Sequence, residues 1–223
     1  MKHATAGTHM SLVYKTAIGS LVTQVVIGLV TGASFVLQIK DSAAREELNV
    51  IIGLELGSQL VEFLWYSIVI CRLRKITTWT RYIDWVVSTP IMLCSTVLFF
   101  SHRDDSVTFV SPFEAVFIYM CLLCNWIMLL FGYLVEIDYI SKPLGLTIGS
   151  LGLVGSFTLL GTHVPDSDGL SVGLFWFMYV IWAGYGVAAV LPYTSKNISY
   201  NILDIVSKNF YGLFLFAYTL TLL

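Results

Sequence analysis

Lys208 lies in an apolar C-terminal stretch, one helical turn after Asp204. A charged side chain in hydrocarbon costs about 2.5 kcal/mol or more, so such residues usually face a protein interior and serve a function. A buried lysine can form a Schiff base with a carbonyl compound, and a nearby carboxylate then balances the cation. The same spacing also suits a structural i,i+4 ion pair or a lysine that extends its amine to the membrane surface. From these two residues alone, all three interpretations remain open.

A second charged pair lies in an earlier apolar segment. Arg81 and Asp84 are one turn apart and are followed by Ser88, Thr89 and Pro90. Asp84 can act as a second anion for a cation at the centre of a bundle, and Ser88 lies one turn further along the same face. Pro90 frees a backbone carbonyl and permits a kink. An ion pair at a helix end is the alternative.

Polar residues form a stripe on the segment before that. Glu55, Ser58, Gln59, Glu62 and Tyr66 are spaced at i, i+3, i+4, i+7 and i+11, which places them on one helical face. Two glutamates with an amide and hydroxyls favour a water-filled crevice along which cations can move. The alternative is a seam of interhelical hydrogen bonds that holds the bundle together.

Two further segments carry polar faces. The first has mostly small hydroxyl residues, which are also common packing residues between membrane helices. The last has a lysine at its centre. Together with the glutamate stripe, these faces favour a shared hydrated path. The residues are Thr16, Ser20, Thr23, Gln24, Thr31 and Ser34 in the first segment and Asn201, Asp204, Lys208 and Tyr211 in the last.

The composition indicates an integral membrane protein of the all-α class. Of 223 residues, 57% are hydrophobic and 12% are charged, and the mean hydropathy is +0.81. Each apolar segment is near the roughly 20 residues that cross a bilayer. The predicted spans are Ser11–Ile39, Glu47–Cys71, Thr78–Ser101, Pro112–Glu136, Leu144–His163, Leu170–Leu191 and Ile198–Leu223. Residues 11–223 are thus one seven-helix domain, and residues 1–10 are expected to be a tag or a disordered end.

Several kinds of site are not expected. The four cysteines fall in or at the ends of apolar spans, which predicts no disulfide framework. Cys121 and Cys124 have CxxC spacing, but they lie on a predicted helix without a second ligand pair, so we expect no metal site. We also expect no enzymatic activity and no nucleic-acid partner.

Two motifs resemble those of microbial (type 1) rhodopsins. They are Arg81-Tyr82-x-Asp84-Trp85-x-x-Ser88-Thr89-Pro90 in the third span and Asp204-x-x-Ser207-Lys208 in the seventh. The resemblance implies a seven-helix bundle with all-trans retinal bound covalently to Lys208 as a protonated Schiff base. Asp84 and Asp204 would be counter-ions, and Arg81 would organise the outer side.

The resemblance also implies a retinal pocket. Gly186 stands where the family usually has proline, and Ala189 where many members have an aromatic residue, which makes the ring end of the pocket unusual. Ser207 would place a dipole beside the Schiff base and shift absorption to shorter wavelength. The implied cofactor-binding residues are Asp84, Trp85, Ser88, Thr89, Met92, Asn125, Met128, Gly132, Trp182, Tyr185, Asp204, Ser207 and Lys208.

Within that family, the second span is similar to the glutamate ladder of algal channelrhodopsins. The compact chain also resembles the small channel-forming rhodopsins of giant viruses. This likeness implies a light-gated cation channel with a central gate of Glu55, Asn209 and Ser20. Glu47 would sit at an inner gate and Glu62 in an outer vestibule. The full implied ion path comprises Ser20, Glu47, Glu55, Gln59, Glu62, Arg81 and Asn209.

A light-driven outward proton pump and a sensory rhodopsin are the alternatives. A pump needs a cytoplasmic proton donor, and the position seven residues after Ser88 is Ser95, which holds no proton to give near neutral pH. The channel's usual acid and cysteine pair is replaced by Asn125 and Thr89. A sensor needs a transducer surface, and the sequence contains no recognisable one.

Orientation and partners follow from the family. The family has its N-terminus outside and its C-terminus in the cytoplasm, although Arg72, Arg74 and Lys75 in one loop favour the opposite by the positive-inside rule. We follow the family, because two motifs are more specific than a few charges. The expected partners are retinal, membrane lipids, monovalent cations or protons, and a second copy of the chain in a homo-oligomer.

Overall fold

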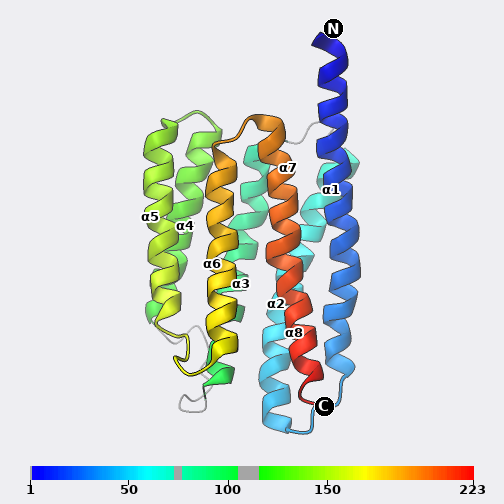
Figure 1. The fold of residues 1–223 in the computed structure, drawn as a ribbon, viewed down its shortest axis with the longest axis vertical. Helices are drawn as coiled ribbons and strands as arrows, with labels where there is room; N and C mark the ends of the chain where they lie inside the picture. Colours follow the sequence, from blue (N-terminus) through cyan, green and yellow to red (C-terminus); the bar gives the residue numbers. More distant parts are fainter. Residues whose placement is uncertain (1, 73–76, 105–115) are drawn as a thin grey trace.

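The computed structural model describes residues 2–72, 77–104 and 116–223, and over these ranges the chain is a bundle of helices without strands (Figure 1). The N-end of the bundle is defined here as the end where α1, α3, α5 and α7 begin, and the C-end as the opposite one. The helices are α1 (Lys2–Ala33), α2 (Ser42–Arg72), α3 (Arg81–Arg103), α4 (Val116–Glu136), α5 (Lys142–Gly161), α6 (Gly169–Ala189), α7 (Tyr193–Asp204) and α8 (Phe210–Leu220).

Short turns adjoin three of these helices. A 3₁₀ turn, η1 (Ser34–Val36), follows α1, and another, η2 (Thr78–Thr80), precedes α3. A π-helical turn, η4 (Ile205–Asn209), joins α7 to α8. The seventh span is therefore α7, η4 and α8 in sequence, and Lys208 lies in the π turn.

The predicted all-α membrane fold is confirmed. Six helices are long and apolar enough to cross a bilayer among the residues described, and the interrupted seventh completes the bundle. Boundaries agree with the predicted spans within a few residues, except at two places. Residues 112–115, predicted to begin the fourth span, lie outside the described residues. The backbone of residues 2–10 is helical and continues α1, whereas a disordered end or tag was expected.

Close packing between α4 and α5 depends on glycine. A Cβ atom at Gly152 would lie 2.7 Å from the backbone oxygen of Cys124 and 2.8 Å from the backbone nitrogen of Met128. Small residues let membrane helices approach closely, since the hydrophobic effect does not drive helices together in lipid. The α4–α5 pair forms one side of the pocket described below.

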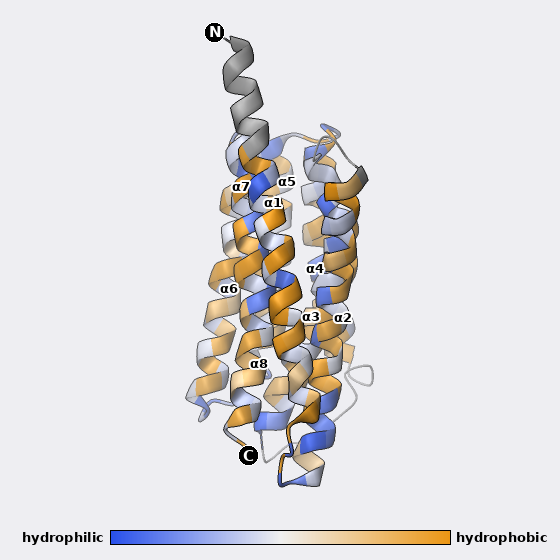
Figure 2. Ribbon diagram, turned by 90° about the vertical axis from the view of Figure 1, so that its right-hand side faces the viewer, coloured by the Kyte–Doolittle hydropathy of each residue, from blue (hydrophilic) through white to orange (hydrophobic). Residues whose placement is uncertain are grey.

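Polar and apolar residues are distributed as a bilayer requires. Large apolar side chains such as Leu29, Leu64 and Val180 are more than half exposed on the outside of the bundle. Figure 2 shows hydrophobic residues along the middle of the helices, with single hydrophilic positions among them. Near the C-end, a cluster that includes Leu48, Phe99 and Leu215 fills the interior. This apolar cluster separates the polar centre of the bundle from the C-end.

Candidate functional site

Lys208 is at the centre of the site. Its side chain is 2% exposed, and its Nζ donates to Asp84 Oδ2 at 2.7 Å. A second carboxylate oxygen, Glu62 Oε2, lies 3.8 Å from the same nitrogen. A buried cation requires such partners, because charges are costly to remove from water. π turns often occur at functional positions of helices, and this one carries the lysine.

Asp204 is held by other groups. Its Oδ2 accepts from Arg81 Nη1 at 3.0 Å and from the Tyr66 hydroxyl at 2.8 Å. Its Oδ1 accepts from the Tyr185 hydroxyl at 2.8 Å and from Trp85 Nε1 at 3.4 Å. Four donors satisfy both oxygens of this carboxylate. Of the two predicted counter-ions, Asp204 is therefore paired with the arginine.

Asparagines complete the arginine's surroundings. Arg81 Nε donates to Asn197 Oδ1 at 3.4 Å, and its Nη2 donates to Asn201 Oδ1. The guanidinium also lies 5.0 Å from the centre of the Trp65 ring, a favourable cation–π distance. Asn201 in turn donates to Thr16 Oγ1 at 2.7 Å, which ties α7 to α1. Asn197 and Trp65 were not singled out from the sequence.

Glu62 was expected in an outer vestibule, and this prediction is wrong. Its side chain is fully buried, lies near Lys208, and accepts a hydrogen bond from Gln24 Nε2 at 2.5 Å. The helical period of α2 predicted the face correctly. A helical period does not tell how far α2 is shifted along its axis relative to the seventh helix. The level of Glu62 in the bundle was therefore predicted incorrectly.

Glu55 lies two turns closer to the C-end and is also fully buried. Gln59 Nε2 donates to Glu55 Oε1 at 3.1 Å. The amide of Gln59 fills the space beside α8: a Cβ atom at Gly212 would come within 2.5 Å of Thr31 Oγ1 and closer still to Gln59. On the α1 side, a Cβ atom at Gly28 would lie 3.3 Å from Gln59 Oε1, a tight contact but not a clash. The side chains of α1, α2 and α8 are therefore closely packed at this level, and Gly212 has no room for a Cβ atom unless they move.

The predicted central gate is only partly assembled. Asn209 is buried, and neither polar atom of its amide has a hydrogen-bond partner among the described residues. Ser20 lies beside Tyr66, nearer the N-end than Gln24, and so it does not meet Glu55 as expected. The sequence placed Ser20 on the correct face of α1 but at the wrong height.

Unsatisfied polar atoms mark one seam of the bundle. Among the described residues, thirteen buried side-chain N or O atoms have no hydrogen-bond partner, and nine of these belong to α1, η1, α2 or η4. Buried polar groups are normally paired, with ordered water if not with protein. The nine atoms belong to Ser20, Gln24, Thr31, Ser34, Glu55, Gln59, Glu62 and Asn209, the last contributing two.

A separate network closes the C-end. Glu47, the predicted inner-gate residue, lies 2.6 Å from His102 Nδ1, and the Tyr218 hydroxyl lies 3.2 Å from His102 Nε2. Arg103 donates to Tyr218 at 3.2 Å and binds both oxygens of Asp168 at 2.7 and 2.9 Å. These hydrogen bonds from Arg103 lower the pKa of Asp168. Of these five residues, only Glu47 was predicted, because the others carry no motif.

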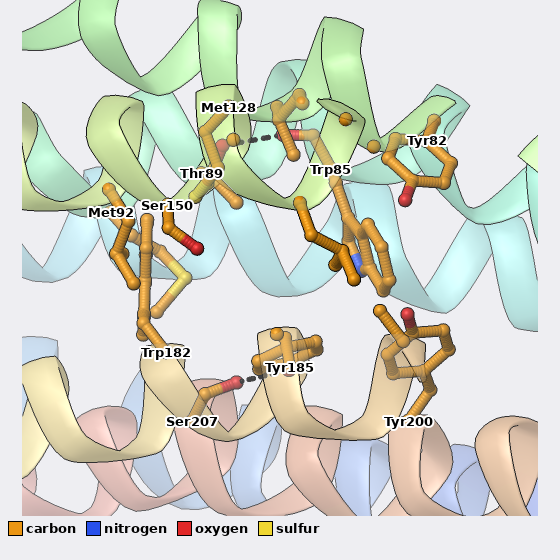
Figure 3. A pocket seen from close by; sticks show the side chains of 18 of the residues that line it. Tyr82, Trp85, Thr89, Met92, Met128, Ser150, Trp182, Tyr185, Tyr200 and Ser207 are labelled. Carbon is orange, nitrogen blue, oxygen red and sulfur yellow. Dashed lines mark hydrogen bonds between the residues drawn. The ribbon is translucent and has the colours of Figure 1, made fainter. Parts of the chain in front are cut away.

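An elongated pocket extends from Lys208 between α3, α4, α5 and α6. Figure 3 shows Tyr82 and Trp85 facing Tyr185 and Tyr200 across it. The predicted residues that line it are Trp85, Thr89, Met92, Met128, Gly132, Trp182, Tyr185, Ser207 and Lys208. Gly186 and Ala189, noted in the sequence as unusual at the ring end of the pocket, also line it, as does Tyr82 of the third-span motif. The sequence did not indicate the rest of the wall, which comprises Leu129, Gly145, Leu146, Gly149, Ser150, Leu153 and Tyr200.

Four predicted residues lie outside the pocket wall but near it: Asp84, Ser88, Asn125 and Asp204, the last of which accepts from Tyr185 of the wall. Asn125 does not line the pocket, but its Nδ2 donates to Oγ1 of the lining residue Thr89 at 2.9 Å. Ser88 lies beside Asp84, and Asp84 lies at the end of the pocket where Lys208 enters. The wall of the pocket is mostly apolar, with several hydroxyl groups, and its charged residue is Lys208.

Comparisons with known proteins agree with this geometry. Residues 16–222 match the family described as bacteriorhodopsin-like protein. The chain is a microbial rhodopsin. No curated protein sequence matches it.

Solved structures share the fold of this rhodopsin. A viral rhodopsin, OLPVRII, is 29% identical with a TM-score of 0.84, and the match covers 95% of this chain and 99% of that one. A blue light-absorbing proteorhodopsin from Med12 is 15% identical, with a TM-score of 0.74 and coverage of 94% and 97%. A light-driven proton pump from Leptosphaeria maculans is 14% identical, with a TM-score of 0.69 and coverage of 95% and 97%. The first match agrees with the predicted likeness to viral rhodopsins.

Membership of the family implies a retinal chromophore, and the residues of this rhodopsin fit one. Lys208 offers the amine, and Asp84 offers a carboxylate 2.7 Å away to balance a cation. The long apolar pocket suits a polyene. Gly132 leaves space for the Tyr82 hydroxyl, which a Cβ atom there would approach to 2.6 Å. The predicted cofactor and the residues present are therefore chemically consistent.

Proposed function

We propose that this rhodopsin is a light-gated cation channel whose path runs between α1, α2 and the seventh helix. The observation that carries the proposal is the seam of nine buried polar atoms without protein partners on these elements. Buried polar atoms without protein partners are normally bound to water, and a set of them on neighbouring helices supports a path that fills with water when it opens. Glu55 and Glu62 on the seam favour cations over anions.

All-trans retinal attached to Lys208 would supply the absorption of light. Asp84 holds the lysine end through its hydrogen bond, while Arg81 and its partners keep Asp204 in place. Asn209 follows Lys208 directly within the π turn, so a movement of the lysine is passed to the amide of Asn209. The unpartnered amide can then rearrange without breaking a hydrogen bond to protein.

The close contacts of Gln59 with Gly28 on α1 and Gly212 on α8 support a narrowest point of the proposed path at this side chain. Gln59 also holds Glu55, and we propose that these two side chains close the path in the dark. Closer to the C-end, the network of Glu47 and His102 forms an inner gate. In this proposal the N-end faces outside, the C-end faces the cytoplasm, and the conducted ions are monovalent cations or protons.

A light-driven outward proton pump is the second candidate. It is favoured by the two carboxylates near Lys208, either of which can accept a proton. Against it, the donor position is occupied by Ser95, whose hydroxyl donates to Ile51 O at 3.2 Å and lies 3.2 Å from the Tyr211 hydroxyl. No carboxyl group stands there to return a proton quickly.

Photocurrents in a voltage-clamped cell test the proposal. We expect currents that reverse sign with voltage, because a channel conducts down the electrochemical gradient. Currents that stay outward at every voltage identify a pump and refute the proposal. Lys208→Ala is the control: it should remove both the visible absorbance and the current. Visible absorbance that persists in this variant without an added retinal imine would show that retinal is bound elsewhere.

A further inference from the structure

Pro90 leaves one backbone carbonyl of α3 without its normal donor. Proline has no N–H, so the carbonyl four residues earlier, that of Val86, receives no hydrogen bond within the helix. In hydrocarbon an unpaired carbonyl is costly, because no water is present to replace the donor. Val86 is 45% exposed on the outside of the bundle, on the surface that faces lipid when the helices span a membrane. This carbonyl therefore requires a donor from another part of the protein.

Trp126 of α4 supplies that donor. Its indole Nε1 donates to the Val86 oxygen at 3.2 Å, and its ring is 43% exposed on the same outer surface. The preceding residue, Asn125, points inward and donates to Thr89 Oγ1 at 2.9 Å. Thr89 Oγ1 in turn donates to the Trp85 oxygen at 2.7 Å. Consecutive residues of α4 thus bind α3 from outside and inside. Trp126 binds the Val86 carbonyl directly, and Asn125 binds the Thr89 hydroxyl, which in turn binds the Trp85 carbonyl.

The part of α3 held in this way carries the residues at the lysine end of the pocket. Asp84 contacts Lys208, and Trp85 lines the pocket and contacts Asp204. Both residues lie within one turn of Val86 on α3. A shift of this turn would change the distance between Asp84 and the lysine. The position of the carboxylate thus depends on how firmly the proline turn is held.

We propose that Trp126 is a positioning residue, whose indole N–H replaces the backbone donor that Pro90 lacks and so fixes the turn of α3 that places Asp84 against Lys208. The inference does not depend on whether the protein conducts or pumps ions. It requires only that Lys208 carries the chromophore. The contact with lipid means that no water takes over when the indole N–H is removed.

The test is a double-mutant cycle with Pro90. Trp126→Phe keeps an aromatic ring and removes the donor. It should shift the absorption maximum and change the rate of return to the dark state by about five- to tenfold, the equivalent of one lost hydrogen bond. Pro90→Ala restores a backbone N–H to the Val86 carbonyl. In that background Trp126→Phe should change the rate by less than about twofold. Equal effects in both backgrounds would mean that the ring acts by packing, and would overturn the proposal.

A matched control and a second measurement complete the test. Trp176 of α6 is 55% exposed, and the structure shows no hydrogen bond from its indole among the described residues. Trp176→Phe should leave colour and rate unchanged. If Pro90→Ala fails to fold, infrared spectra with ¹³C-carbonyl valine replace it, with Val86→Ala to assign the band. Trp126→Phe should raise the frequency of the Val86 carbonyl. An unchanged band refutes the proposal.

Discussion

The three carboxylates around Lys208 should contribute unequally to the colour of the pigment. Removing the charge of Asp84 with Asp84→Asn should shift absorption to the red, because a carboxylate stabilises the ground-state cation more than the excited state, in which positive charge moves away. Glu62→Gln should give a smaller shift in the same direction. Asp204→Asn should give the smallest direct shift, because Arg81 balances that carboxylate at 3.0 Å.

The distances give the expected order. Asp84 Oδ2 and Glu62 Oε2 lie 2.7 and 3.8 Å from Lys208 Nζ. At an effective dielectric constant of about 20, the attraction is about 6 kcal/mol for the nearer carboxylate and about 4 kcal/mol for the farther one. Asp84 should therefore have about 1.4 times the electrostatic effect, plus that of its hydrogen bond. If Glu62 is protonated in the dark, its substitution has still less effect.

Absorption spectra of the purified variants with bound retinal measure these shifts. Glu46→Gln is the control, because Glu46 is an exposed carboxylate at the C-end of the bundle. It should leave the maximum unchanged. A larger red shift for Glu62→Gln than for Asp84→Asn would reverse the order of counter-ions derived from the distances. Unchanged spectra in both variants would transfer the role to Asp204.

Three further predictions concern the ion path and the C-end. Glu55→Gln keeps the shape of the side chain and should change the reversal potential, particularly the proton share, while Asn209→Ala should change the closing rate. If currents reverse but neither variant alters them, the gate lies elsewhere. Gly212→Ala should keep the colour but reduce the photocurrent several-fold, because its methyl group meets polar side chains of α1 and α2; Gly173→Ala, where the added methyl has open space, is the control. Asp168→Asn should lower thermal stability by about 1 kcal/mol or less at neutral pH, as for a partly exposed ion pair. Because the pKa of Asp168 is lowered in the folded state, this contribution is present above the usual carboxylate pKa near 4 and disappears as the pH falls through the lowered value. Melting curves that differ equally at pH 7 and at strongly acidic pH would contradict this.

The sequence predicted the features that repeat along one helix. The spacing of Glu55, Gln59 and Glu62 placed them on one face of α2, and the structure buries all three. The lengths of the apolar segments predicted the spans, because the thickness of a bilayer sets the length of a helix that crosses it. Lys208 and Asp84 were identified by motifs, and in the folded protein they lie in direct contact.

Only the tertiary structure decided how the helices are offset along their axes. That offset brings Glu62 to Lys208, moves Ser20 away from Glu55, and places the Trp126 indole at the Val86 carbonyl. Helical periodicity is a local property, because it follows from backbone hydrogen bonds within a few residues. The offset between helices results from close contacts throughout the bundle, such as those of the glycines of α5. The sequence by itself therefore determined the family, the spans and the buried faces, while side-chain packing across the bundle decided which polar groups meet.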